Sequence, residues 1–73
     1  MNRDHIRETM IRAGVKNLKA FGYPGVNSEN ILTDHIYREF FKAQLEATEN
    51  YGINSDIEAV RLKILAELEQ PTQ

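Results

Sequence analysis

Apolar residues recur along this chain at the spacing of an amphipathic α-helix in several separate segments. In residues 4–21, successive positions set about 100° apart place the apolar side chains in one arc about 180° wide. These side chains are Ile6, Met10, Ile11, Val15, Leu18 and Phe21. Gly22 follows where a left-handed C-cap is expected. Tyr23-Pro24-Gly25-Val26 then matches a type II turn, in which Gly25 supplies the positive φ. The pattern predicts a helix over residues 4–21 that ends at Gly22.

A short helix and a long one are predicted in the middle of the chain. Asn27-Ser28 offers an N-cap for a single helical turn at 28–32, and Thr33-Asp34 offers a second N-cap for a helix over 34–50. On the long helix, Phe40 lies at the centre of a broad apolar face, with Tyr37 and Phe41 towards its edge and Leu45 further out. The other members of that face are Ile36, Ala43, Ala47 and Tyr51. Gly52 is expected to end this helix as Gly22 ends the first.

The last predicted helix covers residues 56–69. Asn54-Ser55-Asp56-Ile57-Glu58 contains a capping box, in which the side chains of Ser55 and Glu58 each bond the other's backbone N–H. Its apolar face carries Ile57, Val60, Ile64, Leu65 and Leu68, while Leu62 lies off that face. Residues 70–73 form a polar tail, and no segment alternates with the period of two typical of a half-buried strand. The sequence therefore predicts an all-α fold in a single domain over residues 1–73, a small bundle of three main helices plus one short helical turn.

Residues 22–41 read GYPGVNSENILTDHIYREFF. This stretch resembles a segment of small, uncharacterised helical proteins of bacteria and their phages, and the resemblance extends loosely into the helix that follows. Since that group has no assigned activity, the resemblance carries no catalytic or binding residue over to this chain. It implies a small accessory protein of bacterial, phage or prophage origin.

Charge and cysteine content narrow the function classes. The 73 residues contain no cysteine and carry a net charge of −2 at pH 7. Residues 1–22 hold five basic and two acidic side chains, whereas residues 23–73 hold four basic and nine acidic ones. This asymmetry indicates either a charged partner or pairing between the two parts of the chain. The absence of a thiol fits a reducing cytosol, no apolar run reaches the length of a membrane span, and the polar N-terminus does not resemble a secretory signal. We therefore expect a cytoplasmic protein that does not enter a membrane.

No catalytic or metal-binding arrangement is predicted. His35 and Glu39 lie four residues apart on one helix face and would offer two ligands to a metal ion, but a zinc site needs three or four. The same two side chains also fit an ordinary exposed pair on a solvated face. Thr33, Asp34 and His35 are adjacent on the chain, so they do not face one another as a catalytic hydroxyl, carboxylate and imidazole must. We expect no catalytic residue, no metal, no cofactor and no small-molecule substrate, and hence no enzyme.

A protein-binding surface is the leading functional hypothesis. Four apolar residues lie at or beyond the edges of their helix faces, where a partner protein or a second subunit would cover them. They are Tyr37, Phe41, Leu45 and Leu62. Single exposed apolar residues are also normal on a monomer. We expect a small non-enzymatic accessory protein that binds another protein or itself, for instance as a homodimer.

Nucleic acid is the alternative partner. Arg12, Lys16 and Lys19 cluster on the face of the first helix opposite its apolar arc, and Arg38 on the next long helix adds a fourth cation. A sequence pI of about 5.6 argues against this alternative, because nucleic-acid-binding modules are usually strongly basic. A third alternative is a chain that donates one residue, such as His35, to an active site on another chain.

Overall fold

The computed structural model describes residues 2–47 and 54–70 of the chain. Over these residues it contains three α-helices, one short 3-10 helix and no strand, which confirms the predicted all-α fold. The elements are α1 (Arg3–Ala20), η1 (Asn30–Leu32), α2 (His35–Ala47) and α3 (Ser55–Glu69). The predicted end of the long helix at residues 48–50, its cap at Gly52, the face position Tyr51 and tail residues 71–73 lie outside the described residues.

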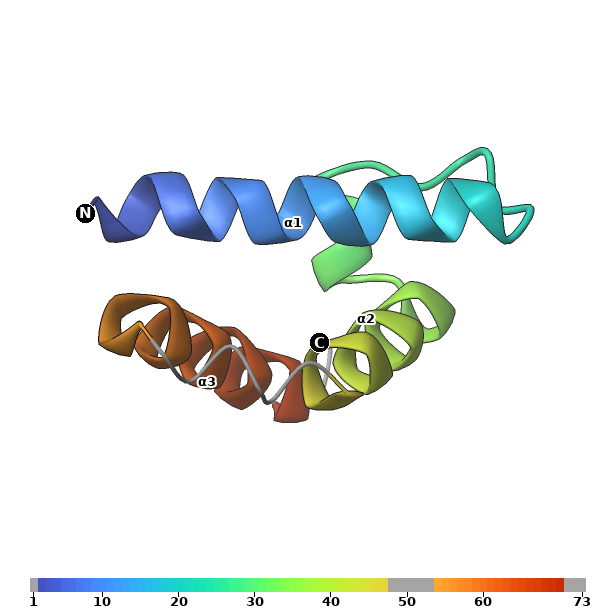
Figure 1. Ribbon diagram of the computed structural model, residues 1–73. Coiled ribbons are helices and arrows are strands. Elements are labelled where there is room, and N and C mark those ends of the chain that lie inside the picture. The colour runs from blue at the N-terminus through green and yellow to red at the C-terminus, as the bar shows by residue number, and fades with distance from the viewer. Residues whose placement is uncertain (1, 48–53, 71–73) are drawn as a thin grey trace.

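The helices form two layers. Figure 1 shows α1 running along one side of the molecule, with α2 and α3 together on the other side and η1 between α1 and α2. The N-terminal half of α1 lies over α3, and its C-terminal half lies over α2. Each long helix therefore contacts both of the others, and the core lies where the three meet.

The core collects apolar side chains from every element. Its buried members are Ile6, Ile11, Leu18, Val26, Ile31, Phe41, Leu45, Val60, Ile64, Leu65 and Leu68. The apolar faces predicted for α1 and α3 supply most of these core residues. Two residues that the sequence placed on apolar helix faces are instead exposed: Phe21 after α1, and Ile36 at the start of α2. On α2 the buried face is rotated towards Arg38, Phe41 and Leu45, so Phe40 is only partly buried and the prediction that it is central was wrong.

The end of α1 follows the prediction closely. Gly22 has a φ of 101°, the backbone N–H of Tyr23 donates to the Leu18 carbonyl at 3.1 Å, and that of Gly22 donates to the Lys19 carbonyl at 3.0 Å. This pair of bonds is the Schellman motif, which satisfies two carbonyls that the helix leaves open. The predicted type II turn after it is wrong, because Gly25 does not have a positive φ. Pro24 fits position two of either common turn type, so the sequence pattern could not distinguish them.

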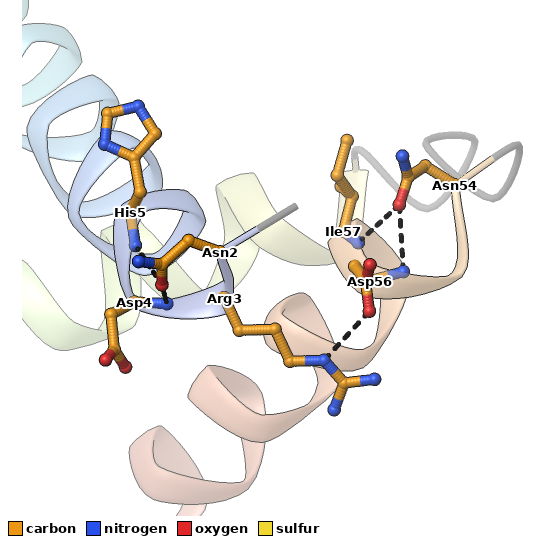
Figure 2. Close-up of polar contacts among 7 residues, drawn as sticks. All are labelled: Asn2, Arg3, Asp4, His5, Asn54, Asp56 and Ile57. Carbon is orange, nitrogen blue, oxygen red and sulfur yellow. Dashed lines mark hydrogen bonds and ion pairs between the residues drawn. The ribbon is translucent and has the colours of Figure 1, made fainter.

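Asparagine and aspartate side chains cap the starts of the three described α-helices. Asp34 Oδ1 accepts from the backbone N–H of Ile36 at 3.0 Å and of Tyr37 at 3.2 Å, which confirms the cap predicted for α2. In α3, Asn54 is the N-cap, accepting from the N–H groups of Asp56 and Ile57, as Figure 2 shows. The capping box of Ser55 and Glu58 was therefore wrong.

The reason is that Asn54 caps as well as serine does and lies one residue earlier. The helix gains a residue, and the Glu58 side chain is left to bond elsewhere. The short helix begins at residue 30 rather than 28, since Asn27 Oδ1 accepts from the N–H groups of Glu29 and Asn30 and holds a turn there instead.

Candidate interaction face

The structure separates the four residues predicted to form an interaction surface. Phe41 has 0% of its surface exposed and Leu45 is also buried, so both belong to the core and that part of the prediction was wrong. Tyr37 is half-buried, and its ring packs edge-on against Tyr23 with centroids 5.9 Å apart. Leu62 is 53% exposed, as expected, but it lies on the outer side of α3, away from Tyr37. These four residues therefore form no continuous surface.

A different set of apolar side chains is exposed together. Phe21, 68% exposed, packs against Phe40 of α2 with ring centroids 5.0 Å apart. Ile36, 58% exposed, lies one helical turn before Phe40 on the same side of α2. The C-terminal end of α1 and the outer side of α2 thus share an apolar surface that no described residue covers.

An open groove of about 300 Å³ lies at the centre of this surface. Its lining residues come from both helices: Asn17, Phe21, Phe40, Ala43 and Gln44. Helical spacing extends the exposed surface along α1 through Ala13 and Ala20, and along α2 through Ala47. We call the set Ala13, Ala20, Phe21, Ile36, Phe40, Ala43 and Ala47 the apolar face.

The two long edges of the apolar face carry opposite charge. On α1, exposed Lys16 lies within one turn of both Ala13 and Ala20, on the side away from α2. On α2, exposed Glu39 and Glu46 adjoin Ala43 on the side away from α1. Neither Lys16 nor these two glutamates form an ion pair with another described residue. The face is therefore a neutral strip with a basic edge on α1 and an acidic edge on α2.

The width of the apolar arc on α2 was the sequence signal that pointed to the apolar face. The apolar positions of α2, from Ala43 through Phe40 to Leu45, span about 200° of the helix, whereas packing on one core needs little more than about 100°. Phe41 and Leu45 fill the core-facing half of that arc, and Phe40 and Ala43 are left on the other half. The periodicity alone gave no means of deciding which half packs on the core and which half is exposed.

Part of the charge asymmetry of the sequence is resolved inside the fold. Arg3 Nε donates to Asp56 Oδ1 at 3.0 Å (Figure 2), and Arg7 binds both oxygens of Glu67 at 2.5 and 3.2 Å. These pairs join the N-terminal half of α1 to α3 beside a polar cleft that also contains Lys63. The intramolecular pairing expected as one explanation therefore accounts for two of the basic groups.

The remaining basic groups of α1 face outwards. Arg12, Lys16 and Lys19 are all exposed, and none has an ion-pair partner within residues 2–47 and 54–70. The basic face predicted from the sequence is thus present on the surface, although Arg38 does not join it.

Arg38 is buried and is used to hold α3. Its Nη2 donates to the main-chain oxygens of Leu68 at 2.8 Å and Glu67 at 3.3 Å, and also to that of Gln70. Its role as a nucleic-acid contact was therefore a wrong prediction. The open carbonyls at a helix C-terminus attract a buried cation, and hydropathy does not register that attraction.

Arg61 makes the reciprocal contact from α3 to α2. Its Nη1 donates to the Leu45 carbonyl at 3.0 Å, while Nε and Nη2 bind the two oxygens of Glu58 at 3.1 and 2.5 Å. Those hydrogen bonds hold the pKa of Glu58 below its ordinary value of 4.5, outweighing the opposing effect of burial. The two buried arginines are structural groups rather than binding sites.

The residues considered for metal binding and catalysis stay on the surface. His35 and Glu39 are exposed on α2, and no three His, Cys, Asp or Glu side chains gather into a possible metal site within the described ranges. No helix in the described part of the chain is long and apolar enough to cross a membrane. The apolar face is therefore the feature on which a functional proposal can be built.

Comparisons with protein-family models, curated proteins and solved structures return no match to this chain. The resemblance of residues 22–41 to small bacterial and phage proteins stays a prediction.

Proposed function

We propose that this chain is a small non-enzymatic interaction protein that binds an amphipathic helical surface through its apolar face. The observation that carries the proposal is the exposure of Phe21 and Ile36 beside partly buried Phe40. Exposed aromatic and branched side chains that adjoin one another mark a protein-binding site more often than scattered ones do.

The chemistry of the face defines the partner. Its central groove is lined by Phe21, Phe40 and Ala43 together with the amide side chains of Asn17 and Gln44. The small alanines on both helices let another helix approach closely, while Phe21, Ile36 and Phe40 supply the larger contacts. The charged edges of the apolar face favour a partner with acidic side chains next to Lys16 and basic side chains next to Glu39 and Glu46. Such edge charges set the orientation of docking and the rate of encounter more than the affinity.

Affinity capture with lysine cross-linking tests the proposal on the intact chain. Ile36→Glu places a charge on the apolar face, and Leu62→Glu is a matched control because Leu62 is almost equally exposed but lies on α3. We expect bound polypeptides to be retained by the wild type and Leu62→Glu, to be lost with Ile36→Glu, and to cross-link to Lys16 rather than Lys63. Binding that survives Ile36→Glu, or that depends on Leu62, would contradict the proposal.

A second candidate function is nucleic-acid binding through Arg12, Lys16 and Lys19. It is favoured by the exposure of all three side chains without an ion pair in the described part of the chain. It predicts duplex binding at about 50 mM salt that weakens steeply as salt rises and is abolished when the three are replaced by alanine. Fluorescence anisotropy that stays flat at that salt concentration would eliminate this function and leave the first intact.

A further inference from the structure

We infer that the amphipathic surface bound by the apolar face is the same face of a second copy of this chain. This inference rests on the proposed function and adds the identity of the partner. In the dimer, the α1 edge of each subunit lies along the α2 edge of the other, so the assembly has a two-fold axis parallel to the groove between α1 and α2.

The charge of the two edges supports this arrangement. A two-fold axis lying along the groove exchanges the two sides of the face, because it turns the second copy over about that line. Lys16 of each subunit then meets Glu39 and Glu46 of the other, and the same contact occurs twice. An axis across the groove would instead bring lysine to lysine and glutamate to glutamate, which opposes association.

Neighbouring charges fit the same arrangement. Arg12 and Lys19 lie further round α1 from Lys16 and extend the basic edge. On α2, half-buried Lys42 lies one row behind the acidic edge, next to Arg38 and Leu45 on the side that packs inside the subunit. The charges that reach the rim of the face are thus positive on one side and negative on the other.

The size of the face sets the expected strength. At a rise of 1.5 Å per residue the 13 residues of α2 extend about 20 Å, and the contacting end of α1 adds about one further helix diameter of 10 Å to the 10 Å width of α2. Contact over that area buries on the order of 1,000 Å² counted over both subunits, near the lower limit for a specific interface. We therefore expect a dissociation constant in the micromolar range, about 1–100 µM, rather than an obligate dimer.

Sedimentation equilibrium on the purified full-length chain between about 1 and 500 µM measures this dimer directly. We expect a monomer–dimer equilibrium that Ile36→Glu shifts to monomer and that Leu62→Glu leaves unchanged. Lys16→Glu and Glu39→Lys should each weaken the homodimer, about three- to tenfold, because each one opposes like charges at both symmetric contacts.

Mixing the two charge-reversed variants is the decisive step. In a heterodimer of Lys16→Glu with Glu39→Lys, the two reversed positions would face each other with opposite charge at one contact, and native Lys16 would face native Glu39 and Glu46 at the other. Because native Glu46 still opposes the reversed charge at the first contact, the mixture should dimerise more tightly than either variant alone but less tightly than the wild type, a recovery that loss of folding in either variant cannot produce. Both positions are exposed, and circular dichroism checks that each variant is folded.

Three results would overturn the inference: a strict monomer over the whole range, no recovery on mixing, or dissociation by Leu62→Glu. A monomer that still binds another polypeptide through Ile36 would refute self-pairing but leave the proposed function standing. A dimer insensitive to Ile36→Glu would refute self-pairing through the apolar face, since self-association would then use another surface, and the capture experiment would decide the proposed function separately.

Discussion

Replacing Gly14 by alanine tests how tightly α1 packs on the rest of the fold. A Cβ at this position would lie 2.8 Å from Cδ1 and Cε1 of Phe41 and 2.9 Å from Cδ1 of Ile31. Favourable carbon contacts lie at about 3.5–4.0 Å, so the neighbours would have to move by roughly 1 Å. Phe41 and Ile31 are both fully buried, so any movement has to be taken up by the surrounding close-packed core.

The expected magnitude is the difference between two opposing effects. Forcing an extra carbon into a packed core costs about 1–3 kcal/mol. Alanine is the better helix former and returns about 1 kcal/mol relative to glycine. We expect Gly14→Ala to lower the free energy of unfolding by about 0–2 kcal/mol, or the melting temperature by up to about 15 °C in a domain of this size.

Thermal and urea unfolding followed by circular dichroism, at one fixed protein concentration, measure this change. Phe41→Leu provides the control, because leucine lacks the ring atom Cε1 that the new Cβ would contact. In that background Gly14→Ala should cost less than it does in the wild type, so the double-mutant cycle should show a coupling. A melting temperature that rises with Gly14→Ala alone would mean that helix propensity wins and that the close approach of α1 to Phe41 is not rigid.

The buried arginine, the Glu58 pair and the α1 cap give three further predictions. Arg38→Met should lower the free energy of unfolding by about 2–3 kcal/mol, because it leaves carbonyls of α3 without their charged donor. The control Arg12→Met, at an exposed position, should change the free energy of unfolding by less than about 0.5 kcal/mol. Equal effects of the two variants in urea unfolding would refute the capping role of Arg38. The pKa of Glu58 is lower in the folded chain than its ordinary value of 4.5. The pair of Glu58 with Arg61 therefore stabilises the fold above pH 4.5, and this stabilisation is lost as the pH falls through the lower pKa of the folded state. Glu58→Gln should therefore flatten the stability profile of the acidic range, and an unchanged profile would show that the pair contributes nothing there. In Gly22→Ala the new Cβ meets no neighbouring atom, but alanine would have to adopt a positive φ. We expect the free energy of unfolding to fall by about 1 kcal/mol in the same assay. A neutral result would mean that the turn adopts another conformation at no cost.

The sequence was most informative where one residue decides a local conformation. Gly22 after the last apolar residue of α1 predicted the helix end, and Asp34 predicted the start of α2. It was less informative where two neighbours are equally suitable, as with Asn54 and Ser55 at the start of α3. Helix propensity and capping preference are local quantities, and their errors stay within a residue or two.

The candidate site was harder to predict because it depends on tertiary packing. Hydropathy counts Arg38 as polar and so turned the expected core face of α2 away from it, towards Phe40 and Ile36. The fold buries Arg38 instead, which places Phe41 and Leu45 inside and leaves Ile36 on the surface. Glycine in a helix interior is less favourable than alanine by about 1 kcal/mol, and Gly14 lies where α1 closely approaches Phe41 of α2 and Ile31 of η1.

The reciprocal contacts of Arg38 and Arg61 also bear on how the chain opens. Each arginine leaves its own helix to bind carbonyls near the C-terminal end of the other, so fraying of either end removes a partner from both helices. Amides of α2 and α3 should therefore exchange with solvent hydrogen as one cooperative unit. The end of α1 before Ile6, where Arg3 pairs with Asp56 on the surface, should exchange in smaller and more frequent openings, whereas the turns that carry buried Ile6 and Ile11 should open with the core. Fraying of that end would thus leave the core closed, whereas release of the whole of α1 would withdraw Ile6, Ile11 and Leu18 from it.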